Sequence, residues 1–253
     1  MNTKGLKQKF LYLYNQRKIY HWNYLDFGLV DRVIEDSIRK NSFSNLSPEV
    51  LDFGCGEMQP NKKLLEHLGF TYTGLDLVSI PNTICWNQKL PLTIKSDSFD
   101  LILLNGSIFY LQNMEDTLKE FYRILKPNGV LVFSTPIFSP LSGDYKELRN
   151  SEIVRFMPKG IHRKLTELEY CETQIQYVGG PGSICGAFLY LIWEKVFKTN
   201  GEENRISNYA LPLFPVFLCL TTFLNLIGLF INSTVRSERF APFIVVDTIK
   251  KPQ

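Results

Sequence analysis

Apolar residues in the first half of the chain alternate between short continuous runs and helical spacings. The continuous runs, typical of strands buried on both faces, occupy residues 49–54, 72–77, 99–106 and 129–136. The segments with apolar residues three and four positions apart, which predict amphipathic helices, occupy residues 24–40, 61–69 and 114–126. Strands that alternate with helices in this way predict an α/β fold, with a parallel sheet covered on both faces.

The pattern changes in the second half. A helix is expected over 159–170 and a strand over 173–179, and strand character returns at 241–251. Between these strands lie an apolar segment at 186–198 and an uncharged run at 206–235. We therefore predict three parts, which are listed by residue range: N-terminal helices at 1–47, a ligand-binding domain at 48–179 plus 241–253, and a hydrophobic helical insertion at 180–240.

Composition and charge exclude several classes of function. The chain has 253 residues, with 28 Lys and Arg against 25 Asp and Glu, and a net charge of +3 is too small to predict a nucleic-acid partner. The five cysteines are an odd number without a C-x-x-C pair, and only three histidines are present, so we expect reduced thiols and no metal site. The N-terminal segment has no small-residue cleavage site typical of a secretory signal, which favours a cytoplasmic location.

The most informative motif follows the first predicted strand. Gly54 and Gly56 allow a tight turn and close approach of a ligand to the backbone. Asp76 ends the next strand, 24 residues after Asp52, where a carboxylate can accept hydrogen bonds from a ribose diol. This arrangement predicts a site for a cofactor that contains adenosine.

Two such cofactors are compatible with the motif, a dinucleotide and S-adenosylmethionine. A dinucleotide fingerprint requires a third glycine, but Gln59 occupies that position. A pyrophosphate would also be repelled by Asp52, two residues before the first glycine, whereas the ammonium of a methionine group would be attracted to it, directly or through water. The charge pattern therefore favours S-adenosylmethionine, and a nicotinamide enzyme is the less favoured alternative.

Four segments carry a resemblance to a known family: LDFGCG, GLDL, LPLTIKSDSFDLILLNG and FYRILKPNGVLVFSTP, in this order over about residues 48–136. The chain resembles the class I S-adenosylmethionine-dependent methyltransferases, most closely their type 11 branch. The resemblance implies a Rossmann-like sheet of seven strands, with the hydrophobic helical insertion before the last strand. It also implies an enzyme that transfers a methyl group from S-adenosyl-L-methionine.

The same resemblance assigns roles to individual residues. Asp52, Gly54 and Gly56 would line the methionine end of the cofactor, with Cys55 as the small residue between the glycines. Asp76 would bind the ribose hydroxyls. The residues expected near the adenine are Leu77, Trp86 and Asn87, and those expected at the reactive end are Asn105 and Gly106. Trp86 has an equal prospect of being a core residue, because aromatic side chains are often buried for packing alone.

Beyond residue 136 the chain is similar to family members from bacterial clusters for surface polysaccharides and lipid-linked sugars. The similar features are VRFMPKGI at 154–161, the apolar insertion and the final FIVVDTIKKP. They imply a small-molecule or lipid-linked saccharide as methyl acceptor. No catalytic base can be assigned, since His162 is more typical of a surface histidine. A methyltransferase-like binding protein without activity, with Met58 and Asn87 marking an altered cofactor site, is the alternative.

The uncharged run at 206–235 is long enough to cross a bilayer as a helix. If 173–179 and 241–251 are neighbouring strands, however, the chain must leave and return on the same side of a membrane, which excludes a single crossing. The remaining options are two interfacial helices, a re-entrant hairpin broken at Pro212 and Pro215, or a hydrophobic lid. We expect peripheral membrane contact through 184–235, on the inner face of the cytoplasmic membrane.

Overall fold

A computed structural model describes residues 19–21, 24–137, 155–192, 198–199, 202–206, 211–235 and 240–252. The chain forms two compact units. The sheet unit comprises residues 32–137, 152–176 and 244–253, and the helical unit comprises 1–31, 138–151 and 177–243. Parts of the predicted ranges 1–47 and 180–240 lie outside the described residues, and the predicted domain boundaries stay a prediction.

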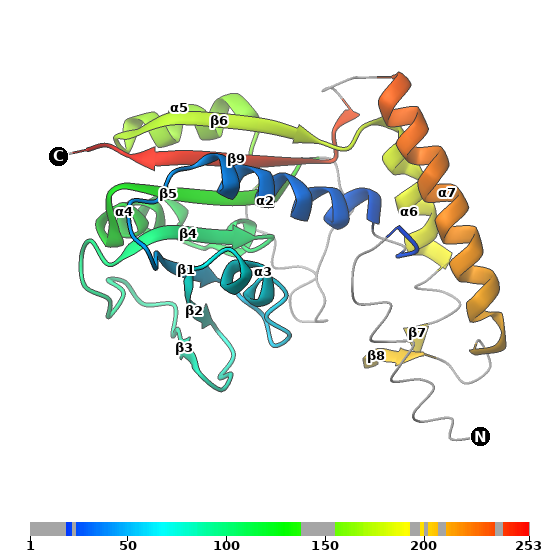
Figure 1. The fold of residues 1–253 in the computed structure, drawn as a ribbon, viewed down its shortest axis with the longest axis horizontal. Coiled ribbons are helices and arrows are strands. Elements are labelled where there is room, and N and C mark those ends of the chain that lie inside the picture. Colours follow the sequence, from blue (N-terminus) through cyan, green and yellow to red (C-terminus); the bar gives the residue numbers. More distant parts are fainter. Residues whose placement is uncertain are drawn as a thin grey trace. The chain divides into compact units, whose positions relative to one another are not determined.

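The main sheet has seven strands in the order β3-β2-β1-β4-β5-β9-β6 (Figure 1). Their bounds are β1 Glu49–Phe53, β2 Thr71–Asp76, β3 Thr83–Cys85, β4 Phe99–Asn105, β5 Leu125–Pro136, β6 Tyr170–Val178 and β9 Phe243–Lys250. The pairs from β3 to β5 are parallel. In Figure 1, β6 and β9 run in opposite directions. The prediction of a Rossmann-like sheet with seven strands is confirmed.

Helices cover both faces of this sheet. Their bounds are α2 Leu29–Lys40, α3 Lys62–His67, α4 Met114–Ile124 and α5 Pro158–Glu167. Alternate residues of each central strand point to opposite faces, so that Leu51 and Phe53 of β1 join a core with α4 and α5, while Val50 and Asp52 point to the other face. Near-continuous apolar strands are therefore necessary, because water reaches neither face.

The expected helix at 24–40 begins differently from the prediction. Residues Tyr24–Gly28 form a π-helix, η1, and the α-helix α2 starts only at Leu29. The other short helical turns are η2 Ile108–Tyr110, η3 Pro181–Ser183 and η5 Leu211–Leu213.

The described helices of the helical unit include α6 Ile184–Ile192 and α7 Phe214–Thr234, and a small hairpin pairs β7 Lys198–Thr199 with β8 Glu202–Ile206. α7 is one continuous helix of 21 residues before the last strand, as the predicted insertion required. Pro212 and Pro215 lie at its start, where a missing N–H costs little. The predicted hairpin broken at these prolines stays a prediction, because residues 193–197 and 207–210 lie outside the described residues.

Candidate cofactor site at the carboxyl ends of β1 and β2

The glycine loop after β1 is fastened to the end of β2. The backbone N–H groups of Gly54 and Cys55 both donate to the carbonyl oxygen of Leu75, at 2.7 and 3.2 Å. Gly54 has a φ of 76°, and a Cβ there would lie only 2.5 Å from the Cβ of Ser107. Ser107 in turn donates to the carbonyl oxygen of Phe53 at 2.7 Å. Only glycine satisfies both the left-handed backbone and this close approach.

Gly56 has the same left-handed backbone but a different environment. Its φ is 65°, and no atom of the described structure lies within 4 Å of the place that a Cβ would take. Its N–H donates to Asp76 Oδ2 at 2.8 Å, and the N–H of Val78 donates to Asp76 Oδ1 at 3.1 Å. Each carboxylate oxygen retains a further lone pair, so Asp76 can still accept hydrogen bonds from a diol. The half-buried carboxylate of Asp76 thus lies next to the open space beside Gly56, at one edge of the sheet.

Asp52 and Asp76 lie on neighbouring strands and on the same face. Asp52 pairs with Gly74 in the parallel register, and Asp76 is two residues further along β2. Strand spacing and rise place their Cα atoms roughly 8 Å apart. Gly74, between them, has no side chain, and a Cβ there would contact Cys55 Sγ at 3.0 Å and the Tyr72 hydroxyl at 3.2 Å. The site therefore depends on a small residue at this position.

The Asp52 carboxylate is completely buried and held by protein groups. The Tyr72 hydroxyl donates to its Oδ2 at 3.0 Å, and Asn61 Nδ2 lies 3.2 and 3.3 Å from its two oxygens. Burial, which disfavours the charged form, raises the pKa of Asp52 to about 6, against the opposing effect of the two hydrogen bonds. Asp52 therefore carries most of its charge at pH 7 and loses it in mildly acidic solution.

Hydrogen bonds extend this arrangement across the sheet to β5. Asn105 Nδ2 donates to Asn61 Oδ1 at 3.1 Å, and Ser134 Oγ donates to Asn105 Oδ1 at 3.0 Å. Side chains from β2, β1, β4 and β5 are thus joined in one row, with Asn61 from the start of α3 as the link. Each Asn amide uses both its donor and its acceptor in this row, which fixes its orientation.

Tyr72 and Cys55 remain protonated in this environment. Burial, then the Asp52 charge, raises the pKa of the Tyr72 hydroxyl, so that Tyr72 acts as a hydrogen-bond donor. Burial likewise raises the pKa of the Cys55 thiol to about 11, which leaves no thiolate at neutral pH. Cys55 is thus a small buried residue of the loop and not a nucleophile.

The residues expected near the adenine adjoin Asp76, since Leu77 follows it and the Trp86 N–H donates to its carbonyl oxygen at 2.7 Å. Trp86 is half-buried, its ring centroid is 5.0 Å from that of Phe53, and its Nε1 donates to the carbonyl oxygen of Lys89. Leu77 is 44% exposed, and the exposed Asn87 accepts the N–H of Lys89 through Oδ1. Trp86 thus has the packing expected of a core residue on one side, and its contact with adenine stays a prediction.

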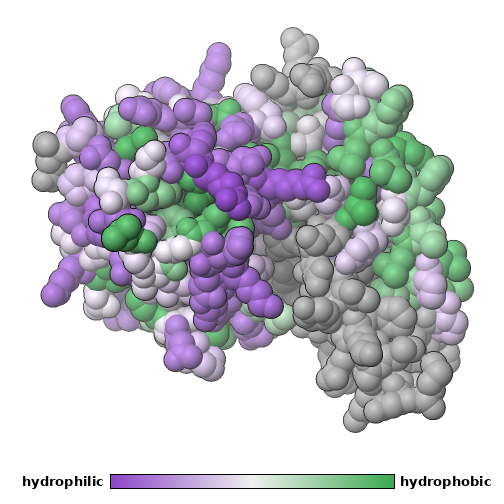
Figure 2. Space-filling view, in the orientation of Figure 1, coloured by the Kyte–Doolittle hydropathy of each residue, from purple (hydrophilic) through white to green (hydrophobic). Residues whose placement is uncertain are grey.

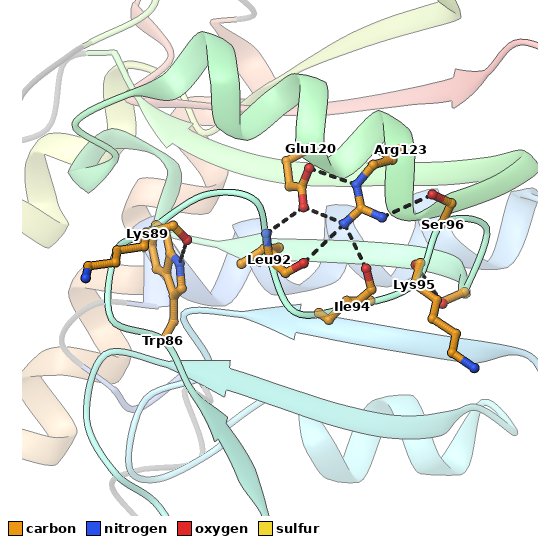
Figure 3. Close-up of polar contacts among 9 residues, drawn as sticks. Trp86, Lys89, Leu92, Ile94, Lys95, Ser96, Glu120 and Arg123 are labelled. Atoms are coloured by element: carbon orange, nitrogen blue, oxygen red, sulfur yellow. Dashed lines mark hydrogen bonds and ion pairs between the residues drawn. The ribbon is translucent and has the colours of Figure 1, made fainter.

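A charged pair on α4 shapes the segment that follows Trp86 (Figure 3). Glu120 Oε1 accepts the N–H of Leu92 at 2.6 Å, and Arg123 forms two hydrogen bonds with the Glu120 carboxylate. Arg123 also donates to the carbonyl oxygens of Leu92 and Ile94 and to Ser96 Oγ. The Arg123 guanidinium holds the pKa of Glu120 below its usual range. The pair ties residues 92–96 to the helix.

Sequence reasoning placed Asp52, Gly54, Gly56, Asp76 and Asn105 at one edge of the sheet, and the structure brings them there. It missed four residues that support them: Asn61, Tyr72, Ser107 and Ser134. Tyr72 could have been predicted from the sequence, because residues 72, 74 and 76 of a strand share one face. His162 lies exposed on α5. Within the described part of the chain, no group of three His, Cys, Asp or Glu side chains could hold a metal ion.

A family described as a methyltransferase domain matches residues 23–175, more than half of the chain. The protein belongs to this methyltransferase family. The cofactor expected for the chain is S-adenosylmethionine. The left-handed glycine loop, the open space beside Gly56 and the Asp76 carboxylate fit that cofactor.

Known proteins are similar to the chain in sequence or in fold. The malonyl-[acyl-carrier protein] O-methyltransferase of Buchnera aphidicola is 32% identical over 125 residues, which cover 45% of this chain and 49% of that protein. The chain thus spans about half the length of the curated relatives that it matches. Its fold is similar to a phosphoethanolamine N-methyltransferase of Haemonchus contortus, with a TM-score of 0.54, 14% identity, and coverage of 88% of this chain and 53% of that one.

A methyltransferase of Archaeoglobus fulgidus gives a TM-score of 0.53 with 16% identity, over 89% of this chain and 95% of that one. At these identities the structural likeness concerns the fold alone.

Proposed function

We propose that this methyltransferase acts on a small-molecule or lipid-linked saccharide acceptor near the cytoplasmic face of a membrane. The main support for the cofactor site is the Asp76 carboxylate at the end of β2. It accepts a hydrogen bond from the Gly56 N–H, beside open space. The resemblance of residues 154–161 and of the final strand to enzymes of surface-polysaccharide clusters supports the acceptor class. The odd number of cysteines favours the cytoplasmic side.

The residues of the site have separate tasks in this proposal. When bound, S-adenosylmethionine supplies an electrophilic methyl group for in-line displacement. Asp76 holds the ribose hydroxyls, and the negative field of Asp52 attracts the ammonium of the methionine group. Asn105, fixed by Asn61 and Ser134, lies where β4 ends and orients groups at the reactive end. Correct alignment of acceptor and methyl group is the main contribution of the protein.

Titration calorimetry with S-adenosylmethionine tests the cofactor site. Asp76→Ala removes the acceptor of the ribose hydroxyls and is expected to raise Kd about 10- to 100-fold, which corresponds to about 1.4–2.8 kcal/mol. The matched control is Glu66→Ala on the exposed face of α3 in the same unit, which should bind like the wild type. Equal affinity for Asp76→Ala and Glu66→Ala would contradict the assignment of Asp76.

The acceptor class requires a separate experiment. A host lysate with its membranes is incubated with the protein and methyl-labelled S-adenosylmethionine, and the label is followed into lipid, glycan and protein fractions. Label in a lipid or glycan fraction supports the proposal. Label on acyl carrier protein would instead favour a carboxyl acceptor, the second candidate that the similarity to malonyl-[acyl-carrier protein] O-methyltransferase suggests.

A further inference from the structure

Helix α7 exposes a row of large apolar side chains. The outward residues are Val216, Leu220, Phe223, Leu226 and Phe230, with exposed fractions from 38% to 68%. Their spacing of three and four places them along one side of the helix over most of its length. Figure 2 shows the hydrophobic surface gathered over this helix. Soluble monomers rarely expose a continuous apolar patch of more than a few hundred Å².

The inward side of α7 begins with the buried Phe214 and Phe217 and continues with smaller residues. Thr221, Asn225 and Gly228 are buried within the helical unit. Asn225 Nδ2 donates to the carbonyl oxygens of Ile19 and His21, at 2.6 and 2.8 Å. A Cβ on Gly228 would overlap Leu25 and lie 2.7 Å from the carbonyl oxygen of Gly182, so the chains pack backbone to backbone there.

From Thr221 onward this arrangement reverses the pattern of a helix on a soluble protein, where the apolar stripe faces the core. It is the pattern found where lipid surrounds a helix, because small residues and Asn side chains then mediate contacts between chain segments and large apolar residues face acyl chains. The run from residue 206 to 235 also contains no charged residue. From Val216 to Phe230 the exposed row therefore matches hydrocarbon, and exposed polar residues follow at Ser233 and Thr234.

The connections of α7 decide how it can meet a bilayer. Its 21 residues extend about 32 Å, close to the thickness of the hydrocarbon core. It is the single described helix that is long and apolar enough to cross. The strands on either side of the insertion, β6 and β9, are neighbours in one sheet, so the chain must return to the side from which it left. Within the described residues no helix of similar length returns beside α7, since α6 is described over Ile184–Ile192, about 14 Å.

We propose that α7 lies in the plane of the membrane, with its outward side buried in one leaflet of a phospholipid bilayer. The outward residues insert to a similar shallow depth along the helix, while the inward side remains packed on η1 and η3. This attachment rests on the fold of the helical unit and is independent of the methyl-transfer proposal.

Flotation of the full chain with vesicles of phosphatidylethanolamine and phosphatidylglycerol tests the attachment. The wild type should float, and Phe223→Asp with Phe230→Asp should lower the vesicle-bound fraction at least tenfold. The matched control replaces Leu46 and Met157 by Asp, since these apolar residues of the sheet unit are at least as exposed as Phe223 and Phe230. Circular dichroism and a cooperative denaturation transition verify that each variant is folded.

Depth measurements distinguish an in-plane helix from a crossing one. A fluorophore is attached to Val216→Cys, Phe223→Cys or Phe230→Cys, in a background with the exposed Cys85 and Cys219 replaced by Ser. Quenching by lipids labelled near the headgroup should be equal at the three positions. Deeper burial of position 223 than of 216 and 230 would overturn the in-plane arrangement.

Two further results would overturn the proposal as a whole. One is a folded wild type that stays at the bottom of the gradient. The other is a stable dimer, measured by light scattering, that Phe223→Asp converts to a monomer, which would assign the surface to a second copy of the chain.

Discussion

Strand β1 and helix α7 are both largely apolar and both bury a polar side chain, but they do so in opposite settings. Along β1 every residue after Glu49 is buried, and Asp52 is enclosed by Tyr72 and Asn61. Along α7, beyond the buried Phe214 and Phe217, the buried positions are the small or polar Thr221, Asn225 and Gly228, while Phe223, Leu226 and Phe230 are exposed. The difference shows that apolar content alone does not reveal what surrounds an element. The direction in which the large side chains point does reveal it.

The largest effect is expected when the close packing of α7 is disturbed. Gly182→Ala would place a Cβ on the carbonyl oxygen of Gly228, which cannot move without shifting the helix. We expect a loss of about 3 kcal/mol in the stability of the helical unit, measured by chemical denaturation in detergent. Gly186→Ala on α6 is the control, since its Cβ would meet Asp26 Oδ2 at an ordinary 3.5 Å. Equal losses for both variants would show that the close backbone approach is unimportant.

The buried carboxylate of β1 offers a second test, through pH. The pKa of Asp52 is raised to about 6 in the folded chain from 3.8, so the folded state binds more protons between these values. Its contribution to stability is therefore greatest below about pH 4 and is lost as pH rises through 6, by about 2–3 kcal/mol. Urea denaturation of the wild type and Asp52→Asn from pH 4 to 7 measures this difference. A difference that is constant with pH would refute the raised pKa.

Asp52 also provides a test of cofactor binding. Because the charged carboxylate attracts the cofactor's ammonium, affinity for S-adenosylmethionine should fall several-fold in the wild type between pH 7 and pH 5. Asp52→Asn should bind weakly at both pH values, whereas Glu66→Ala should follow the wild type. Calorimetry at the two pH values provides the measurement.

The smallest expected effect on stability concerns the charged pair on α4. Glu120→Gln removes the charge that binds Arg123 and weakens the bond to the Leu92 N–H, at a cost of about 1.5 kcal/mol near neutral pH. Because the pKa of Glu120 is lowered, its contribution is present above the ordinary value of 4.5 and is lost as pH falls through the lower folded value. Glu115 forms an exposed ion pair with Lys119 on the same helix. Glu115→Gln should therefore leave the denaturation midpoint unchanged.

Much of the sheet could be predicted from the sequence. The runs at 49–54, 99–106 and 129–136 became β1, β4 and β5 within a few residues, because buried parallel strands require continuous apolar sequence. The loop residues Gly54 and Gly56 were also predictable, since only glycine suits their positive φ at no steric cost. The π-helical start at Tyr24–Gly28 was not, because the residues there have the same helical periodicity as those of α2.

The sequence by itself determined the family, the cofactor class and the acid at position 76, because these depend on residue types at fixed spacings along adjacent elements. Only the tertiary structure decided which groups enclose Asp52, since Asn61 and Tyr72 reach it across a loop and a neighbouring strand. It also decided the outward direction of the large residues of α7. Periodicity can reveal that a helix has two sides, but only its packing partners determine which of them faces away from the protein.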